Sequence, residues 1–153
     1  MPDALPKCRA PFASDGEIAI LTAGFLAKTL PAKAWTNDAH WAVAIDLAMN
    51  HGDFDLPRDM PEAISTYNVA SGTPNTDSGG YHETITQAAV AMVRHELKTG
   101  APGRATHQVV NDLMASPTGK SDWLLAHWTK DVLMSVRARR AWVPPDLKPL
   151  PGA

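Results

Sequence analysis

Residues 81–100 read YHETITQAAVAMVRHELKTG. Within them Ile85, Ala89 and Met92 recur four and three residues apart, which places their side chains on one face of an α-helix. Leu97 extends the apolar pattern, and the glycine that ends the segment is a typical helix stop. Because apolar residues are frequent all along it, the segment predicts a central, mostly buried helix that ends at about residue 99.

Further helices are predicted on both sides of this segment. Ser14 and Glu17 form a capping box ahead of a helix that ends near residue 30. Thr36 is the expected N-cap of a second helix, which Asn50-His51-Gly52 ends. Residues 53–61 predict a loop, and a third helix is expected to begin at Pro61. Shorter helices are expected over residues 105–115, over residues 123–127 with Ser121 as cap, and over residues 136–142 with Ser135 as cap.

No stretch combines alternating polarity with the β-branched residues of a strand, so the sequence predicts an all-α fold. We expect one domain over residues 1–153, a compact bundle of about five to seven helices. Residues 1–13 are expected to form a loose N-terminal arm. Residues 143–153 are rich in proline and are expected to form an extended tail. This tail is predicted to pack Trp142, Leu147 and Leu150 against the bundle.

Composition narrows the class of protein. The chain has 153 residues, of which 44% are hydrophobic and 20% charged, with a net charge of −2, and these values are typical of one globular domain. The only dense basic run comprises Arg137, Arg139 and Arg140, which predicts the solvated side of a last helix and no nucleic-acid partner.

The same composition predicts a cytoplasmic protein with no membrane partner. No apolar run is long enough to span a bilayer, and the N-terminal residues lack the apolar core of a secretory signal. Cys8 is the single cysteine, so the chain has neither an internal disulfide nor a cysteine-based zinc site. Self-association through apolar helix faces stays open.

The candidate functional residues begin where a loop rich in turn-forming residues, 71–80, meets Tyr81-His82-Glu83. His82 can act as a metal ligand or general base, Glu83 as a ligand or proton shuttle, and Tyr81 as a phenolic donor. A position at a helix start favours a neutral imidazole. The alternative is structural, with Glu83 favouring the helix dipole and His82 capping or packing.

The second helix supplies a partner for these residues. Asn37 and His40 lie three apart on one face of its first turn. If the two helix starts are close in space, His40, His82 and Glu83 supply two imidazoles and one carboxylate. This set of ligands suits a divalent metal with open coordination positions. The alternative for His40 is a hydrogen-bonded imidazole at the edge of the core.

Other residues are expected to line a ligand pocket, and the alternative for Tyr67 is a structural side chain with its hydroxyl at the boundary of the core. Tyr67 and Asn68 come from the third helix, and Trp41 and Asn37 from the second. The sequence contains no nucleophile elbow, no phosphate-binding glycine loop and no His-Glu-x-x-His motif. Acyl-serine chemistry and nucleotide hydrolysis are therefore disfavoured.

The chain resembles a family of small uncharacterised bacterial proteins over residues 25–149. The resemblance rests on a Trp-Thr-x-x-x-His segment at residues 35–40, an Asn-Thr segment followed by Gly-Tyr-His-Glu-Thr at residues 75–84, and three shorter matches at residues 25–31, 67–68 and 142–147. The family commonly has a second histidine where this chain has Asn37, which is a poorer ligand for a transition metal.

The resemblance implies an all-helical fold and a single site that contains His40 and residues 81–83. It implies no particular reaction. A site without a cofactor then has His40 or His82 as base, Glu83 orienting that base, and Tyr67 or Tyr81 donating to a substrate oxygen.

Two functions follow from these expectations. The first is an enzyme acting on a small organic molecule, of the lyase, isomerase or hydrolase type, through His, Glu and Tyr acid-base chemistry with or without a divalent metal. The second is a non-catalytic module that binds a small ligand or partner, in which the same residues are structural.

Overall fold

The computed structural model describes residues 11–152. In that range it contains seven α-helices and no strand, with one isolated bridge between Thr76 and Gly79, so the predicted all-α fold is confirmed. No helix in the described range combines the length and apolarity needed to cross a membrane. Cys8 and most of the predicted N-terminal arm lie outside the described residues.

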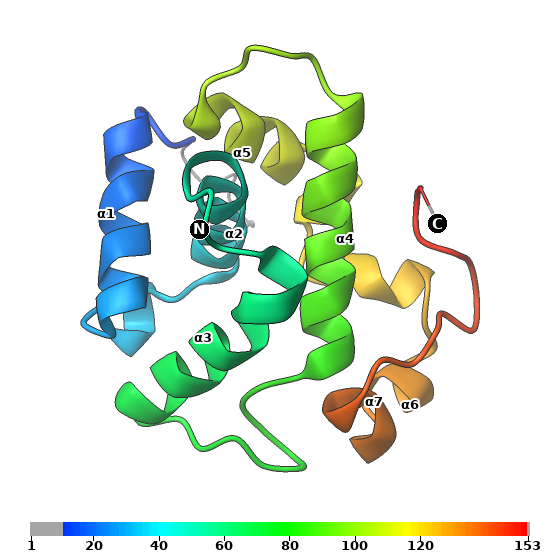
Figure 1. Cartoon of the computed structure of the whole chain (residues 1–153). Helices are drawn as coiled ribbons and strands as arrows, with labels where there is room; N and C mark the ends of the chain where they lie inside the picture. Colours follow the sequence, from blue (N-terminus) through cyan, green and yellow to red (C-terminus); the bar gives the residue numbers. More distant parts are fainter. Residues whose placement is uncertain (1–10, 153) are drawn as a thin grey trace, which may run out of the picture.

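The first two long helices begin at the predicted caps. Helix α1, Asp15–Ala27, starts after Ser14, whose Oγ accepts the Glu17 N–H at 3.3 Å. Helix α2, Asn37–Asn50, starts after Thr36, whose Oγ1 accepts the Ala39 N–H at 3.2 Å. A 3-10 turn, η2 (Ala32–Ala34), connects them. Helix α2 passes through the middle of the bundle (Figure 1), and its buried residues include Trp41, Val43, Ile45 and Leu47.

Helix α3 begins earlier than the sequence predicts. It spans Leu56–Ala70, so most of the predicted loop over residues 53–61 is helical and that prediction is wrong. Asp55 is the N-cap and accepts the Arg58 N–H at 3.0 Å, while Asp59 accepts the Asp55 N–H at 2.8 Å. Proline at the start of a helix removes an amide that has no partner there in any case, which is why the helix tolerates Pro57.

Pro61 lies inside α3, and another helix compensates for it. A proline has no N–H to give to the carbonyl four residues earlier, which here belongs to Pro57. The side-chain amide of Gln87 on α4 donates to that carbonyl at 3.1 Å. A long-range hydrogen bond therefore replaces the missing helical one.

Removal of this bond gives a first test of the packing between α3 and α4. We expect Gln87→Ala to lower the free energy of unfolding by about 1 kcal/mol, because the Pro57 carbonyl loses its donor. Urea denaturation measures the change. Thr99→Ala on the same helix is the control, because its hydroxyl bonds only to the His95 carbonyl within that helix. Equal stability of Gln87→Ala and the parent chain contradicts the compensation.

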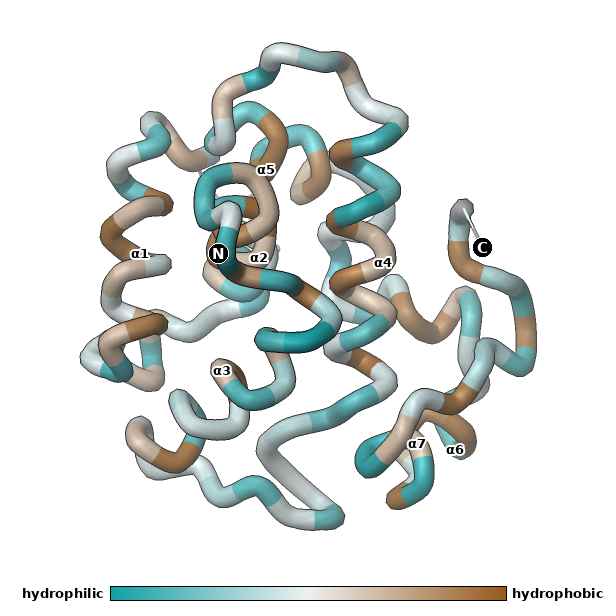
Figure 2. Tube along the Cα trace, in the orientation of Figure 1, coloured by the Kyte–Doolittle hydropathy of each residue, from teal (hydrophilic) through white to brown (hydrophobic). Residues whose placement is uncertain are grey.

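Helices α4, Glu83–Thr99, and α5, Thr106–Ala115, follow the predicted boundaries. Helix α4 packs against α2, α3, α5 and α7, and Figure 2 shows apolar residues recurring along it. Its buried residues include Ala88, Val90, Met92 and Val93, which lie on more than one face of the helix. The prediction of a central helix is thus correct.

The C-terminal third is built from short pieces. They are the 3-10 turns η3 (Pro117–Gly119) and η4 (Trp123–Ala126) and the helices α6 (Lys130–Leu133) and α7 (Val136–Arg140). Ser135 caps α7 as predicted. Ser121 does not cap η4, whose N-cap is Asp122 without a side-chain bond. Helix α6, which Thr129 caps, was not predicted.

The tail after α7 contains no helix. Leu150 is 6% exposed, as expected, but Trp142 is 42% and Leu147 56% exposed, so the prediction that these two pack inside is wrong. Backbone hydrogen bonds, rather than these two side chains, attach the tail to the bundle. Val143 accepts the Trp128 indole N–H at 2.9 Å and donates its own N–H to Thr84 Oγ1 at 3.0 Å.

Candidate ligand-binding cavity

A cavity of about 490 Å³ lies among α2, α3, α4 and the loop that precedes α4. Its volume is in the range of sites that take small organic molecules. Most of the wall is apolar, and the side chains that form this part include Trp41, Ala44, Met60, Ile64, Ile85 and Val90. A few polar residues interrupt it, which is the arrangement that orients a ligand.

His40 is the free titratable group of this cavity. It lies at the end of the first turn of α2, is exposed, and lines the cavity. Among residues 11–152 neither ring nitrogen has a hydrogen-bond partner. The surrounding protein lowers the pKa of His40 to about 4 through desolvation. At pH 7 the imidazole is therefore neutral, and both its nitrogens are available to bind a ligand.

An aromatic group fixes the place of His40. The ring centroids of His40 and Trp35 are 4.0 Å apart, and Phe25 stacks on Trp35 at 4.6 Å. Tyr67 packs against Trp35 at 5.3 Å, and its hydroxyl donates to the Leu30 carbonyl at 2.8 Å. Tyr67 therefore supports the wall of the cavity, and its proton is already used within the protein.

His82 lines the same cavity, but both its nitrogens are engaged. It is the N-cap of α4, and its Nδ1 accepts the Ile85 N–H at 3.2 Å. Its Nε2 lies 2.7 Å from the Leu133 carbonyl, so this nitrogen carries the proton and donates. Burial lowers the pKa of His82, which keeps the ring neutral. These two bonds leave His82 no nitrogen for a metal or a substrate.

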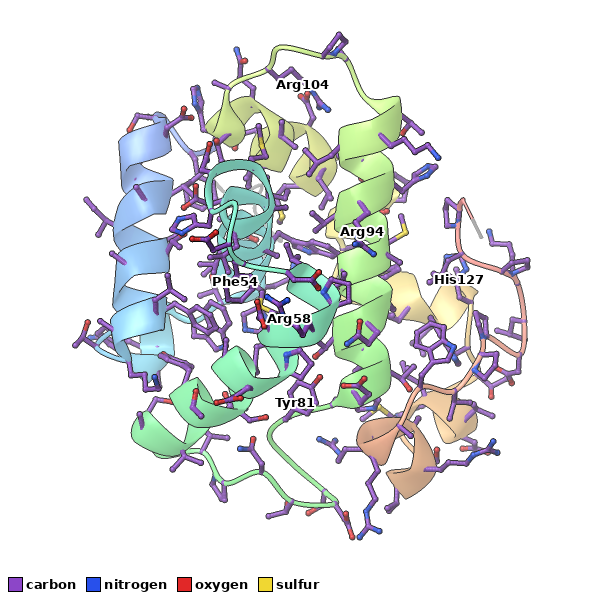
Figure 3. The ribbon with its side chains drawn as sticks, in the orientation of Figure 1. Phe54, Arg58, Tyr81, Arg94, Arg104 and His127 are labelled. Atoms are coloured by element: carbon purple, nitrogen blue, oxygen red, sulfur yellow. The ribbon has the colours of Figure 1, made fainter. Side chains whose placement is uncertain are left out.

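Tyr81 lies between α3 and the start of α4 (Figure 3), and it forms a pair with Glu83. The Tyr81 hydroxyl donates to the Glu83 carboxylate at 2.5 Å. Burial and this carboxylate raise the pKa of Tyr81, so the phenol stays protonated. Tyr81 lines the cavity, whereas Glu83 does not. The Thr86 side chain also hydrogen-bonds the Tyr81 oxygen, which leaves one lone pair of that oxygen for a ligand.

The structure brings together most of the residues that the sequence singles out. His40, Tyr81 and His82 line one cavity, and so do Trp41, Tyr67 and Asn68 from the predicted ligand-binding set. Asn37 does not, because its side-chain amide donates to the Gly119 carbonyl at 3.1 Å.

The residues present do not fit the predicted metal set of His40, His82 and Glu83. Within residues 11–152 no three His, Cys, Asp or Glu side chains are grouped so that they can hold a metal ion. His82 has no free nitrogen, and Glu83 accepts the Tyr81 hydroxyl outside the cavity lining. We therefore derive no step through a metal.

Sequence reasoning missed two polar parts of the wall. Thr86 lies four residues after His82 on α4, so helical spacing alone places it beside the same cavity. Ser71 and Thr73 come from the end of α3 and the loop that follows it. No local pattern indicates that these two face the cavity, because a contact between the loop and α2 depends on tertiary packing.

Two side chains hold the loop of residues 71–82 against the cavity. Asn75 Oδ1 accepts the Asn68 side-chain amide at 3.0 Å and the Tyr81 N–H at 2.9 Å. From α7, Arg139 donates to the carbonyls of Gly80 and Tyr81, at 3.2 Å each. The predicted solvated face of the last helix therefore also fixes a wall of the cavity.

Comparison of the chain with known protein-family models, curated protein sequences and solved structures finds no match. The resemblance to a bacterial family stays a prediction.

The low pKa of His40 is the first property of the cavity to test. We expect its ring to titrate well below the ordinary 6.5 in a proton NMR titration of the histidine Cε1–H signals. The unfolded chain binds this proton below pH 6.5 and the folded chain does not, so acidification through this range favours unfolding. His40→Gln assigns the signal. Titration of His40 at or above 6.5 contradicts the desolvated position.

Proposed function

We propose that the protein is an enzyme that acts on a small organic molecule by acid-base chemistry, with His40 as the general base. The observation that carries this proposal is an unpartnered imidazole that is neutral at pH 7 and faces a mostly apolar cavity of about 490 Å³. A base in such a position can take a proton from a bound molecule without competition from a protein hydrogen bond. Reactions that begin with proton abstraction include those of lyases, isomerases and hydrolases.

Tyr81 has a supporting part in this proposal. Its hydroxyl donates to Glu83 and accepts from Thr86, which leaves one lone pair of the phenolic oxygen for a hydroxyl or N–H of the substrate. Glu83 thus orients Tyr81 rather than the base. His82 holds the start of α4 in place through Ile85 and Leu133.

A specific observation favours a second function, a non-catalytic ligand-binding module. The hydrogen bonds of His82 and Glu83 are all within the protein, as a structural role for this cluster predicts. In that case His40 hydrogen-bonds a ligand and no bond changes. The two functions predict the same binding and differ in the reaction.

The compound 5-nitrobenzisoxazole separates them. It is small and aromatic, and a base opens its ring: the base takes the ring C–H proton, the N–O bond breaks, and a coloured cyanophenolate is released. Under the enzyme proposal the protein accelerates this reaction, and His40→Ala lowers the rate by a factor on the order of 10² to 10⁴. His95→Ala is the matched control, because His95 is on α4 but outside the cavity lining.

Binding of the probe is followed in parallel by quenching of the cavity tryptophans, Trp35 and Trp41. Binding without acceleration contradicts the enzyme and supports the binding module. If the protein neither binds the probe nor accelerates its reaction, the result contradicts both proposed functions. Equal loss of rate in His40→Ala and His95→Ala contradicts the role of His40.

A further inference from the structure

We infer that the molecule bound in this cavity is uncharged, with an apolar body and a neutral hydrogen-bonding group such as an amide, carbonyl or hydroxyl. This inference rests on the proposed function, whose site it specifies further. It follows from what forms the cavity wall and from which hydrogen-bonding groups remain free there.

Among residues 11–152, no lysine, arginine, aspartate or glutamate lines the cavity. The polar side chains there are hydroxyls, one amide and two imidazoles. A second hollow, of about 330 Å³ between α1 and α3, is a contrast within the same protein, because charged side chains line it: Lys28, Arg58, Asp59 and Glu62. The absence of charge is thus specific to the larger cavity.

Two charged side chains that contact residues of the cavity wall are already bonded within the protein. Glu83 accepts the Tyr81 hydroxyl, and Arg139 donates to two backbone carbonyls of the loop. His82 has both nitrogens bonded, and desolvation by the surrounding protein keeps His40 neutral at pH 7. A charged ligand would lose hydration here without gaining a counter-charge, which is strongly unfavourable.

Neutral hydrogen-bonding groups, by contrast, are available in the cavity wall. The neutral ring of His40 has one donor and one acceptor nitrogen. The side-chain amide of Asn68 donates to Asn75, and its side-chain Oδ1 has no donor within residues 11–152. Donors and acceptors together suit a group with both functions, such as an amide.

Three probes of nearly equal shape test the charge: 2-naphthamide, 2-naphthoate and 2-naphthamidine. They have the same ring system and are neutral, anionic and cationic at pH 7. Calorimetric titration should give binding of the amide and affinities at least roughly tenfold weaker for both ions.

Thr73→Lys provides a gain-of-binding test. Thr73 is an exposed cavity residue whose side chain has no hydrogen bond within residues 11–152, so the variant is expected to fold. The new ammonium should strengthen naphthoate binding by roughly tenfold, whereas Thr73→Gln, a neutral control, should not.

The outcomes separate this inference from the function on which it rests. Naphthoate or naphthamidine binding as tightly as naphthamide overturns the inference and leaves the cavity as a ligand site. Binding of 5-nitrobenzisoxazole without binding of naphthamide overturns the amide preference. Failure of all three naphthalenes and of 5-nitrobenzisoxazole overturns the proposed function itself.

Discussion

Gly80→Ala is expected to lower the free energy of unfolding by about 3 kcal/mol. Two costs combine at this position. Gly80 has φ +80°, a conformation that alanine adopts only with strain, and an added Cβ would lie 2.5 Å from the Pro74 carbonyl oxygen and 2.6 Å from Asn75 Oδ1. The first obstacle is backbone, so it cannot move aside as a flexible side chain would.

Two other glycines of the same loop separate these costs. Gly72 has φ +95° with no atom near the added Cβ, so alanine there should cost only the strain, about 1 to 2 kcal/mol. At Gly79 the nearest atom is 3.9 Å away and the glycine needs no positive φ, so the change should be small. Urea denaturation of the three variants gives the ranking. If the Gly80→Ala variant is no less stable than the Gly72→Ala variant, the predicted steric cost at residue 80 is contradicted.

The same variant connects the loop to the cavity. Gly80 lines the cavity, and a shift of Asn75 to make room would disturb its bonds to Asn68 and to the Tyr81 N–H. Gly80→Ala should therefore weaken binding of 5-nitrobenzisoxazole under conditions where the variant is folded, whereas Gly79→Ala should not.

The parts of the fold that the sequence predicts are those with local signals. Thr36 and Ser135 cap their helices through bonds to the backbone three residues ahead, so a short stretch of sequence contains all the information needed. The start of α3 is different. From the sequence, Pro61 predicts the first turn of a helix, but it lies inside α3 because Gln87, from another helix, supplies the missing donor. No local pattern contains that contact.

The same distinction between local and long-range signals applies to the residues of the candidate cavity. Helical spacing and the resemblance favoured one site containing His40 and Tyr81, and both line one cavity. The roles of Asn37 and His82 depend on the carbonyls of Gly119 and Leu133, which come from short C-terminal elements. Nothing in the sequence near either side chain indicates these acceptors, and they change a candidate ligand into a structural residue.

His82→Ala is expected to lower the free energy of unfolding by about 2 to 3 kcal/mol. The variant removes the cap of α4 and leaves the Leu133 carbonyl without its donor. His82→Asn is the matched control, because asparagine can accept the Ile85 N–H but is too short to reach Leu133. It should recover about 1 kcal/mol of the loss, which is the usual contribution of an N-cap.

The pH dependence of stability gives a second measurement on the same variants. Burial lowers the folded-state pKa of His82 below the ordinary 6.5. Below pH 6.5 the unfolded chain binds a proton that the folded chain does not, so stability should fall as the solution is acidified. Both variants should lose part of this slope, because neither side chain titrates in that range.

A variant as stable as the parent that no longer accelerates opening of 5-nitrobenzisoxazole would instead place His82 in the chemistry. A destabilised variant that still accelerates the reaction supports a structural role for His82, and His40 then remains the proposed base.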